Sequence, residues 1–517
     1  MPTIPYYDWI AHHAGRRPKT LAIHDLQTGR KLTYADLDRR TNRLVAALAA
    51  LGIGKGDRVA LLAPNCPEYF ELQFACGRLG AIMLPLNWRL TVPELEYILG
   101  DSTPKLLVHD SSFAEQAKAL SRNRLEIDPE RPDSDYERAL AEAGDAPAPE
   151  ALTHDDIAMV MYTSGTTGHP KGAIITHGMV FWNCVNLGIP ALITPETVQL
   201  VVLPLFHTGG LNCYANPVLH AGGTILVMRT FDPGQALDAI SDPSLGITHF
   251  FAVPAPYQFM MQHPKFQSAD LSRLRIAGVG GAPCALSILE TWTARGVPLV
   301  QGWGMTETSP VCAIGNPPKD MAGLSETDWR VKTGRIIPGV ELRITDDSGA
   351  VVPWDGESLG EIEVRGSWIT GSYYAVDDPE KFHDGWLRTG DVASVLPNGY
   401  VMISDRAKDV IKSGGEWVSS VDLENTLMGH PDVLECAVIG VPDPRWDERP
   451  MACVVLKPGS EVTADELRAW LSERTAKFWL PERWTFITEV PKTSVGKFDK
   501  KVLRARHSAG ELDVEIV

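Results

Sequence analysis

The 517-residue sequence lacks several features that mark whole classes of protein. No apolar run reaches the roughly 18 residues that a membrane-spanning helix needs, so we expect no membrane span. Residues 1–5 show no charged start followed by an apolar core, so we expect no secretory signal. The formal net charge is −17, and the sequence contains no block of Lys and Arg. Both features disfavour broad nucleic-acid binding.

Paired cysteine motifs are absent as well. The eight cysteines are scattered and none forms a CxxC pair, which argues against a structural zinc site. Most of them stand in apolar surroundings and are predicted to be buried thiols in a reducing compartment. We therefore expect a cytoplasmic protein. The cysteines are Cys66, Cys76, Cys184, Cys213, Cys284, Cys312, Cys436 and Cys453.

The pattern that is present predicts an α/β fold. Hydrophobic content of 44% and charged content of 22% are ordinary for a globular protein, and the length predicts two or more domains. Short apolar runs alternate with stretches of helical periodicity, as in largely parallel sheets covered by helices. The expected strands are 59–62, 82–84, 106–108, 201–205, 225–227, 249–253 and 274–279, and the expected helices include 37–51 and 68–79. The acidic, Pro-rich segment 128–155 is predicted to be an exposed connection.

A change of pattern near Asp405 predicts a domain boundary. Strands expected at 361–365 and 400–404 precede it, and a compact α+β unit of roughly 110 residues follows. In that unit, residues 433–440 and 451–456 are predicted strands. Thr463 and Glu466 form a capping-box start for a helix that runs to about Lys477. We expect a large N-terminal body over 1–404 and a small C-terminal unit over 405–517.

The run 162–172, Tyr-Thr-Ser-Gly-Thr-Thr-Gly-His-Pro-Lys-Gly, has the composition of a loop that holds phosphate. Its glycines let the backbone approach an anion closely, while hydroxyls and a lysine supply donors and charge. Lys171 lies between Pro170 and Gly172, so the run is not a Walker A loop. An ordinary Ser/Thr/Gly surface loop fits about equally well. The candidate phosphate-binding residues are Thr163, Ser164, Gly165, Thr166, Thr167, Gly168 and Lys171.

Four shorter motifs are weak when each is taken alone. Residues 278–283 end a buried strand in glycines, where a flat ring can approach the backbone or the chain simply turns. Residues 301–307 combine an aromatic ring, a hydroxyl and a carboxylate that could serve a nucleotide, but taken alone they favour a core Trp beside a solvated Glu. Asp391 follows Thr389 and Gly390 at an expected turn, where most aspartates merely cap the turn. Lys497 lies in the loop 491–497, where most lysines are solvated.

Together, and in this order, the motifs resemble the adenylate-forming superfamily of acyl-CoA synthetases, beetle luciferases and peptide-synthetase adenylation domains. The resemblance extends from Leu32 to Lys497. It implies an α/β fold with a large N-terminal domain of two sheet-based subdomains plus a β-barrel. A small, mobile α+β C-terminal lid would follow, with Asp405 as its hinge. The implied enzyme is an AMP-forming acid–thiol ligase, an acyl-CoA synthetase.

The resemblance also implies chemistry in two steps. A carboxylate attacks the α-phosphorus of ATP, which gives an acyl-adenylate and pyrophosphate. The thiol of coenzyme A then attacks the acyl carbonyl, and AMP leaves. Such phosphoryl chemistry depends on positioning and charge stabilisation more than on covalent catalysis. The partners would be a small carboxylic acid, ATP, Mg²⁺ and coenzyme A, with no nucleic acid. A homodimer is compatible with the sequence, but the oligomeric state is not readable from it.

Roles for the nucleotide-binding residues follow from the resemblance. Thr163, Ser164, Thr166, Thr167 and Lys171 would line the loop over the β- and γ-phosphates. Thr306 would hold the α-phosphate, and Glu307 would hold Mg²⁺. Adenine would lie between Trp303 and the segment formed by Gly281, Ala282 and Pro283, with Trp303 in place of the more usual Tyr. Gly302, Gly304 and Met305 would border the nucleotide, and Asp391 and Arg406 would hold the ribose hydroxyls.

The lid would supply a different residue to each step. Lys497 would bridge the carboxylate and the α-phosphate during adenylation, as negative charge concentrates there. After the lid rotates, the face 408–415 would meet the site and bring Lys412 with it. Glycines 414 and 415 would then border the pantetheine tunnel. His207 matches a position beside the carboxylate and the tunnel mouth, although a hydrogen-bonded strand-end histidine fits nearly as well.

The identity of the acid is the least determined part of the prediction. The runs 412–420 and 303–308 look most like those of medium- or long-chain fatty acyl-CoA synthetases, and aryl- or cinnamate-type ligases share the same frame. An amino-acid adenylation module and an inactive nucleotide-binding protein fit less well. The first lacks its acidic anchor near Phe206, and the second would not keep Glu307, Arg406 and Lys497. Candidate pocket residues are Trp182, Asn183, Phe206, Leu211, Asn212 and Val311.

Overall fold

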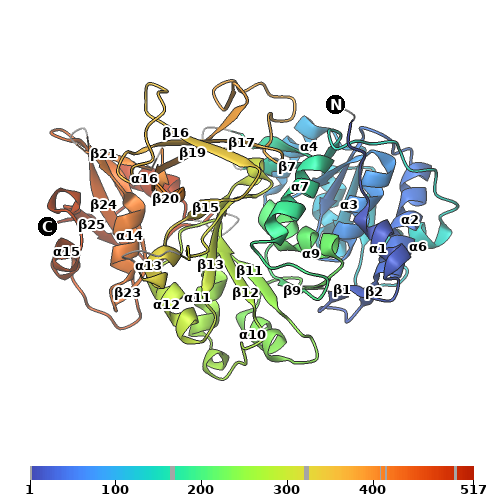
Figure 1. Ribbon diagram of the computed structural model, residues 1–517, viewed down its shortest axis with the longest axis horizontal. Helices are drawn as coiled ribbons and strands as arrows, with labels where there is room; N and C mark the ends of the chain where they lie inside the picture. Colours follow the sequence, from blue (N-terminus) through green and yellow to red (C-terminus); the bar gives the residue numbers. More distant parts are fainter. Residues whose placement is uncertain (1–2, 164–168, 320–324, 408, 414–415, 494–497) are drawn as a thin grey trace.

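The computed structural model describes residues 3–163, 169–319, 325–407, 409–413, 416–493 and 498–517. The chain forms three sheets, and the largest of them also includes two strands that precede the first sheet in the sequence (Figure 1). The first, in blue, and the C-terminal one, in red, lie at opposite ends of the molecule. Most of the large second sheet, in green, yellow and orange, lies between them, and it contains most of the motifs named above. Its two edge strands at Leu21–Asp25 and Lys31–Thr33 are blue and lie at the N-terminal end.

The first sheet has six strands in the order β6-β5-β3-β4-β7-β8. Its pairs are parallel except the last, in which β7 and β8 form an antiparallel hairpin. Parallel sheets have both faces covered by helices, and here α3 is buried on all sides. The elements are β3 (Arg58–Leu62), α3 (Glu68–Leu79), β4 (Ile82–Pro85), α4 (Val92–Ser102), β5 (Leu106–Asp110), α5 (Ala114–Leu120), β6 (Arg124–Ile127), α6 (Asp135–Glu142), β7 (Ile157–Thr163) and β8 (Lys171–Thr176).

The second sheet has fourteen strands. From β1 to β13 its central strands are parallel, and from β14 onwards every pair is antiparallel. Its strands are β1 (Leu21–Asp25), β2 (Lys31–Thr33), β9 (Val198–Val201), β10 (Thr224–Val227), β11 (His249–Ala252), β12 (Ile276–Gly280), β13 (Leu299–Gly304), β14 (Val311–Ile314), β15 (Gly334–Ile336), β16 (Val340–Thr345), β17 (Gly360–Gly366), β18 (Phe382–His383), β19 (Trp386–Val395) and β20 (Tyr400–Arg406).

Helices and short helical turns accompany the second sheet and the chain before it. They are α1 (Trp9–Arg16), α2 (Tyr34–Ala50), α7 (His177–Gly188), α8 (Thr208–Gly210), the π-helix η2 (Leu211–Ala215), α9 (Asn216–Ala221), α10 (Pro233–Ser241), α11 (Pro254–Gln262), α12 (Leu286–Ala294), the 3₁₀ turn η4 (Thr306–Thr308) and α13 (Glu326–Arg330). Two apolar cores lie against these elements, one shared with the first sheet and one beneath α10, α11 and α12.

The C-terminal sheet forms a separate α+β unit with its own core. The chain leaves the second sheet at Arg406, the last residue of β20, and enters the third at β21 (Ile411–Ser413). The other elements are β22 (Glu416–Val418), α14 (Ser420–Met428), β23 (Val433–Asp443), β24 (Asp447–Leu456), α15 (Ala464–Ser472), β25 (Arg483–Phe486), α16 (Lys500–Ser508) and β26 (Glu515–Ile516). A boundary at Asp405 and its action as a hinge stay predictions.

Most of the expected elements are present, and three expectations were wrong. The strand expected at 201–205 is Val198–Val201, because Pro204 lacks an N–H and Leu205 instead donates to Asn65. The helix expected to reach Lys477 ends at Ser472, although its capping box is present. The segment 128–155 contains the helix α6, which packs Tyr136 and Leu140 into the core.

Two further expectations concern the cysteines and the membrane. All eight cysteine side chains are buried free thiols, as predicted. Over the described residues, no helix combines the length and apolar character that crossing a membrane requires.

Candidate active site

The ends of two neighbouring parallel strands bring two of the sequence motifs together. Gly280 of β12 pairs with Gly302 of β13, so the residues after β12, namely 281–283, lie beside the end of β13. A side chain at Gly304 would place its Cβ 1.6 Å from the carbonyl oxygen of Pro310, so only glycine fits the crossing with β14. The predicted adenine-binding segments therefore share one edge of the sheet, where ligands of open α/β sheets commonly bind.

Trp303 donates a hydrogen bond to the carboxylate predicted to hold ribose. Its Nε1 lies 2.8 Å from Oδ2 of Asp391, and Nε of Arg406 lies 2.7 Å from Oδ1 of the same carboxylate. Trp303 is 9% exposed and Asp391 is buried, so their hydrogen bond forms away from bulk water, whereas the Arg406 side chain is 37% exposed. The structure thus brings Asp391 and Arg406 together, and Trp303 orients the carboxylate between them.

The sequence predicts Asp391 at a turn, but the structure places it inside β19. The β17–β19 pairing shifts register between Glu361 and Glu363, and Gly390 takes a left-handed φ of 76°. A bulge in a strand redirects the neighbouring side chain and is common next to binding sites. The bulge accounts for the position of Asp391, opposite Arg406 on β20.

Glu307 lies in the 3₁₀ turn η4 directly after β13 and is 4% exposed. Its Oε1 accepts a hydrogen bond from the phenol of Tyr373 at 2.6 Å, and its carbonyl accepts from the amide of Thr370 at 2.8 Å. Burial, followed by the charge of Glu307, raises the pKa of Tyr373, so this phenol stays a donor at neutral pH. The segment 370–373 therefore fixes the carboxylate that is predicted to hold Mg²⁺.

Lys171 is the first residue of β8, and it pairs across the hairpin with Thr163, the last residue of β7. The predicted phosphate loop is therefore a hairpin connection. The Nζ of Lys171 lies 2.7 Å from Oδ2 of Asp378 and 5.4 Å from the ring centre of Tyr373. Lys171 and Glu307 thus approach the same phenol from two elements, and the hairpin base reaches the segment that holds Glu307.

Several predicted site residues lie outside the described part of the chain. These are Ser164, Gly165, Thr166, Thr167, Gly168 and Lys497, together with the glycines at 414 and 415.

His207 and Lys412 are described. His207 caps α8, where its Nδ1 accepts from the amide of Gly209 at 3.1 Å. Lys412 lies 3.5 Å from the carboxylate of Asp347, an exposed residue after β16. The structure therefore contains a contact of Lys412 with the large body that the sequence did not predict.

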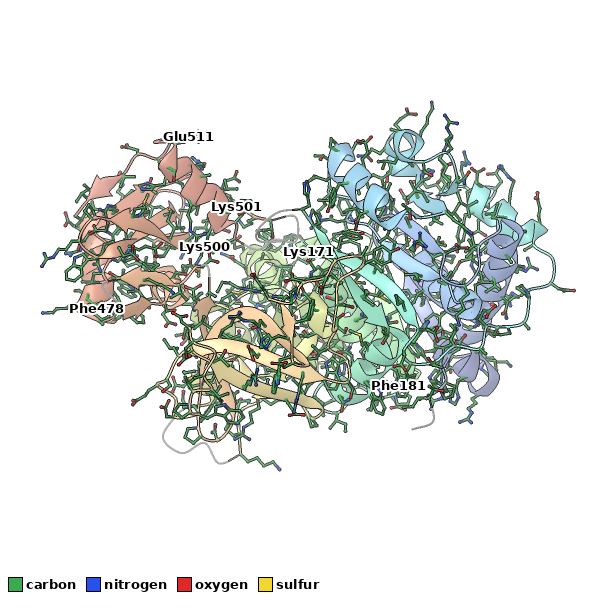
Figure 2. The ribbon with its side chains drawn as sticks, turned by 90° about the horizontal axis from the view of Figure 1, so that it is seen from above. Lys171, Phe181, Phe478, Lys500, Lys501 and Glu511 are labelled. Atoms are coloured by element: carbon green, nitrogen blue, oxygen red, sulfur yellow. The ribbon has the colours of Figure 1, made fainter. Side chains whose placement is uncertain are left out.

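A buried polar chain connects the predicted hinge to the C-terminal helix. The Oδ2 of Asp405 accepts from the amide of Ser420 at 2.8 Å and from the Ser420 hydroxyl. Lys500 donates to that hydroxyl at 2.5 Å and pairs with Oε1 of Glu424 at 2.7 Å. Figure 2 labels Lys500 in the C-terminal unit and Lys171 in the middle of the molecule. Lys500 thus joins α16 to both α14 and the end of β20.

Sequence reasoning missed three residues of this region. Tyr373, Asp378 and Lys381 lie in the connection between β17 and β18, which carries no motif of its own. Tyr373 holds Glu307, and Asp378 holds Lys171. Lys381 donates to the carbonyl of Thr389 at 3.3 Å. Only the adjacent tyrosines at 373 and 374 gave a signal, and nothing local shows which carboxylate they reach.

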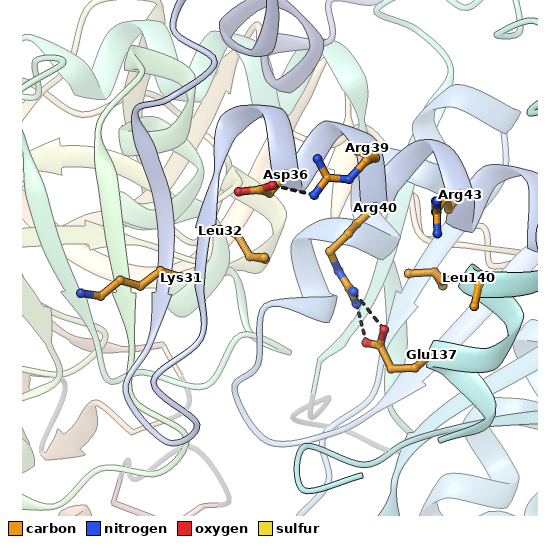
Figure 3. A pocket seen from close by; sticks show the side chains of 9 residues that line it. Lys31, Leu32, Asp36, Arg39, Arg40, Arg43, Glu137 and Leu140 are labelled. Carbon is orange, nitrogen blue, oxygen red and sulfur yellow. Dashed lines mark hydrogen bonds and ion pairs between the residues drawn. The ribbon is translucent and has the colours of Figure 1, made fainter. Parts of the chain in front are cut away.

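A cavity of about 440 Å³ lies away from these residues. It is bounded by β2, α2 and α6 at the blue end of the molecule (Figures 1 and 3). Arg40 pairs there with Glu137 at 2.6 Å and also with the buried Glu71. These charges of the cavity wall are therefore neutralised by other residues of the protein. The cavity contains none of the predicted site residues.

Comparison with known proteins identifies the family. The AMP-binding enzyme family matches residues 10–374, and the AMP-binding enzyme C-terminal domain matches residues 422–497. The chain is 41% identical over 503 residues to a feruloyl-CoA synthase of an Amycolatopsis species, and the alignment covers 96% of this chain and 98% of the relative. It is 36% identical over 525 residues to a long-chain-fatty-acid–CoA ligase of Thermus thermophilus, and this alignment covers 97% of this chain and 95% of the relative.

Solved structures agree with this assignment. ATP-bound MatB from Rhodopseudomonas palustris superposes with a TM-score of 0.87 at 31% identity, covering 97% of this chain and 99% of that one. The α/β fold with a large N-terminal part and a small C-terminal part is therefore confirmed. Trp303 and Glu307 lie within the range 10–374 that the family matches, whereas Asp391 lies between the two matched ranges. The chain belongs to the AMP-binding enzyme family and is an AMP-forming acid–CoA ligase, an acyl-CoA synthetase that uses ATP and coenzyme A.

Proposed function

We propose that the acid is aromatic, of the cinnamate type, and carries a polar group on its ring. The observation behind this proposal is a pair of buried asparagines among the candidate pocket residues. Asn183 on α7 donates from Nδ2 to the carbonyl of Asn212 on η2 at 2.8 Å. Among the described residues, Oδ1 of Asn183 and Nδ2 of Asn212 have no hydrogen-bond partner.

Each buried polar atom without a hydrogen-bond partner lowers the stability of the fold by about 1–3 kcal/mol. A ligand group that bonds to such an atom recovers part of this cost. A phenolic hydroxyl can donate to one amide oxygen and accept from one amide nitrogen, whereas an alkyl chain can do neither. The greater identity to a feruloyl-CoA synthase than to the long-chain ligase supports the same choice. Buried Phe206, Leu211 and Val311 would supply the apolar part of the pocket.

A medium- or long-chain fatty acid is the second candidate, and the sequence motifs favoured it. Its support is the 36% identity to a long-chain-fatty-acid–CoA ligase and the apolar side chains among the candidate pocket residues. The two candidates differ in what they ask of Asn183 and Asn212, because a fatty acid leaves the two unpaired amide atoms without partners.

The test compares kcat/KM for CoA ligation across 4-hydroxycinnamate, cinnamate and straight-chain acids of 8 to 16 carbons. We expect the hydroxylated acid to exceed cinnamate by about ten-fold or more, since a site built to bond a hydroxyl discriminates strongly against its absence. Asn212→Leu should reduce that preference. Asn425→Leu is the matched control, because Asn425 also has a buried unpaired Oδ1 but lies in the lid. A higher kcat/KM for straight-chain acids than for both aromatic acids would refute the proposal and favour the second candidate.

For adenylation we propose the following roles. Thr163 and Lys171, with the loop between them, would hold the β- and γ-phosphates. Thr306 would hold the α-phosphate, and the Asp391–Arg406 pair would hold the ribose. Their support is the set of contacts that link these segments, from Lys171 to Asp378, from Tyr373 to Glu307 and from Trp303 to Asp391. Lys497 would bridge the carboxylate and the α-phosphate.

Glu307 fits a magnesium ion as a single carboxylate ligand. No group of three or more His, Cys, Asp or Glu that could hold a metal occurs among the described residues, so a metal would also need oxygens of the substrate phosphates. Mg²⁺ is bound in this way in many nucleotide sites. Among those residues the only side chain bonded to the Glu307 carboxylate is Tyr373, at Oε1. The metal would neutralise phosphate charge there.

For thioester formation we propose that the lid rotates about Asp405 and that Lys412 approaches the site. Lys412 here contacts Asp347, so this role requires that contact to break. The exposure of Asp347 makes the pair a weak one, about 1 kcal/mol or less, which a lid rotation can readily replace. His207 would position the acid and border the tunnel, because the attacking carboxylate is already ionised and needs no general base.

A further inference from the structure

We propose that Lys381 binds the α-phosphate of the nucleotide. Lys381 immediately precedes β18 and has its backbone carbonyl bonded to the amide of Arg388 on β19 at 2.9 Å. Its Nζ lies 3.3 Å from the carbonyl oxygen of Thr389, two residues before Asp391. The inference rests on the placement of ribose and phosphates in the proposed function.

The surroundings of Lys381 are those of the candidate nucleotide site. Its amide donates to Oδ1 of Asp378 at 3.1 Å, and the other oxygen of that carboxylate holds Lys171. The adjacent Phe382 packs against the ring of Tyr373, with ring centres 5.1 Å apart, and Tyr373 holds Glu307. Lys381 therefore lies between the side chains assigned to ribose and those assigned to the outer phosphates and the metal.

The ammonium group of Lys381 has capacity for a ligand. It carries three donors, and among the described residues only the Thr389 carbonyl accepts from it. No carboxylate of the described residues lies within 4.0 Å of its Nζ. A cation that is partly removed from water and lacks a close counter-ion is stabilised by an incoming anion. Burial lowers the pKa of Lys381, while the charges of Glu307 and Asp391 oppose this effect.

The position selects the α-phosphate. Lys381 contacts Thr389, two residues before the carboxylate assigned to the ribose, and it also contacts Asp378, whose other oxygen holds the lysine assigned to the outer phosphates. The phosphate between those two regions is the one that stays attached to the nucleoside in AMP and in the acyl-adenylate. Lys381 would thus hold the nucleotide before and after pyrophosphate leaves.

An alternative is that Lys381 only neutralises the carboxylates around it. AMP and adenosine distinguish the two, because they differ in the α-phosphate alone. Calorimetric competition on the full chain gives Kd for both nucleotides with the wild type, Lys381→Met and Lys381→Arg. Lys105→Met is the control, since Lys105 is an exposed lysine paired with Asp57 outside the site.

We expect Lys381→Met to weaken AMP binding by about ten-fold or more while the Kd for adenosine changes less than about two-fold. Lys381→Arg keeps the charge and should retain most of the affinity. Equal losses for both nucleotides, or no loss for AMP, would overturn the proposal. If Lys381→Met does not fold, the same comparison with Lys381→Gln decides it. A wild type that binds neither AMP nor ATP would overturn the nucleotide site of the proposed function as well.

Discussion

Removal of Lys500 should loosen the C-terminal unit far more than removal of the lysine next to it. Lys500 and Glu424 form a pair whose side chains are 9% and 7% exposed, with 2.7 Å between Nζ and Oε1. Burial raises the pKa of Glu424 to about 7, with Lys500 acting in the opposite direction. At pH 8 both members are therefore charged, and Lys500→Met leaves a buried carboxylate without its cation.

Loss of one partner of a buried pair typically costs about 3–5 kcal/mol. The lower end, about 3 kcal/mol, is expected here for two reasons. Glu424 keeps its bond from the amide of Val438 at 2.7 Å, and it can take up a proton. The same reasoning predicts a smaller defect at pH 5.5 than at pH 8. The lone carboxylate has a folded pKa above its unfolded value, so its destabilising effect is complete only above that folded pKa.

The assay is hydrogen exchange of the full chain, followed by mass spectrometry on peptides from α14 and β23. A loss of about 3 kcal/mol in local stability accelerates exchange by about 100-fold. Peptides from β3 to β5 in the first sheet should not change. Lys501→Met is the matched control, because Lys501 is exposed on the same helix (Figure 2).

The double variant Lys500→Met with Glu424→Gln tests the reasoning directly. Glutamine keeps an acceptor for Val438 and removes the unpaired charge, so exchange should return to within about ten-fold of the wild type. Two results would refute the argument. One is a Lys500→Met rate within about five-fold of the wild type, and the other is a double variant that loses the sum of the two single effects.

Three further predictions concern catalysis, nucleotide binding and pH. Lys497→Ala should slow adenylate formation by about 10²–10³ and leave thioester formation from supplied acyl-adenylate intact, as single-turnover assays of each step can check. Trp303→Phe keeps an aromatic face but removes the donor to Asp391, so the KM for ATP should rise by about ten-fold; an unchanged KM contradicts this. Burial lowers the pKa of His177 from 6.5 to about 4, so the unfolded chain binds more protons between these values and stability falls as pH drops from 6.5 to 4. His177→Gln should make Tm less sensitive to pH across this window. An unaltered dependence of Tm on pH would contradict the conclusion that the lowered pKa of His177 causes the loss of stability.

The order of motifs in the sequence was sufficient to predict the family and the α/β fold. Each motif is a short local run, and glycines, hydroxyls and a strand end are visible without knowing what lies opposite. The helix 68–79 was predicted with its observed bounds for the same reason, since a helix and its ends are local features. Where the chain bends away from a strand, as at Pro204, an apolar run alone was misleading.

The contacts that build the site were decided by tertiary structure. Trp303 and Asp391 are 88 residues apart in sequence, and Lys171 and Asp378 are 207 apart. Sequence predicted that Asp391 serves the nucleotide but placed it at a turn, whereas a bulge in β19 aims it at Trp303 and Arg406. Strand order and register determine which distant side chains meet, and local periodicity encodes neither. The sequence by itself therefore determined the family and its reaction, and only the folded sheets decided which side chains hold one another in place.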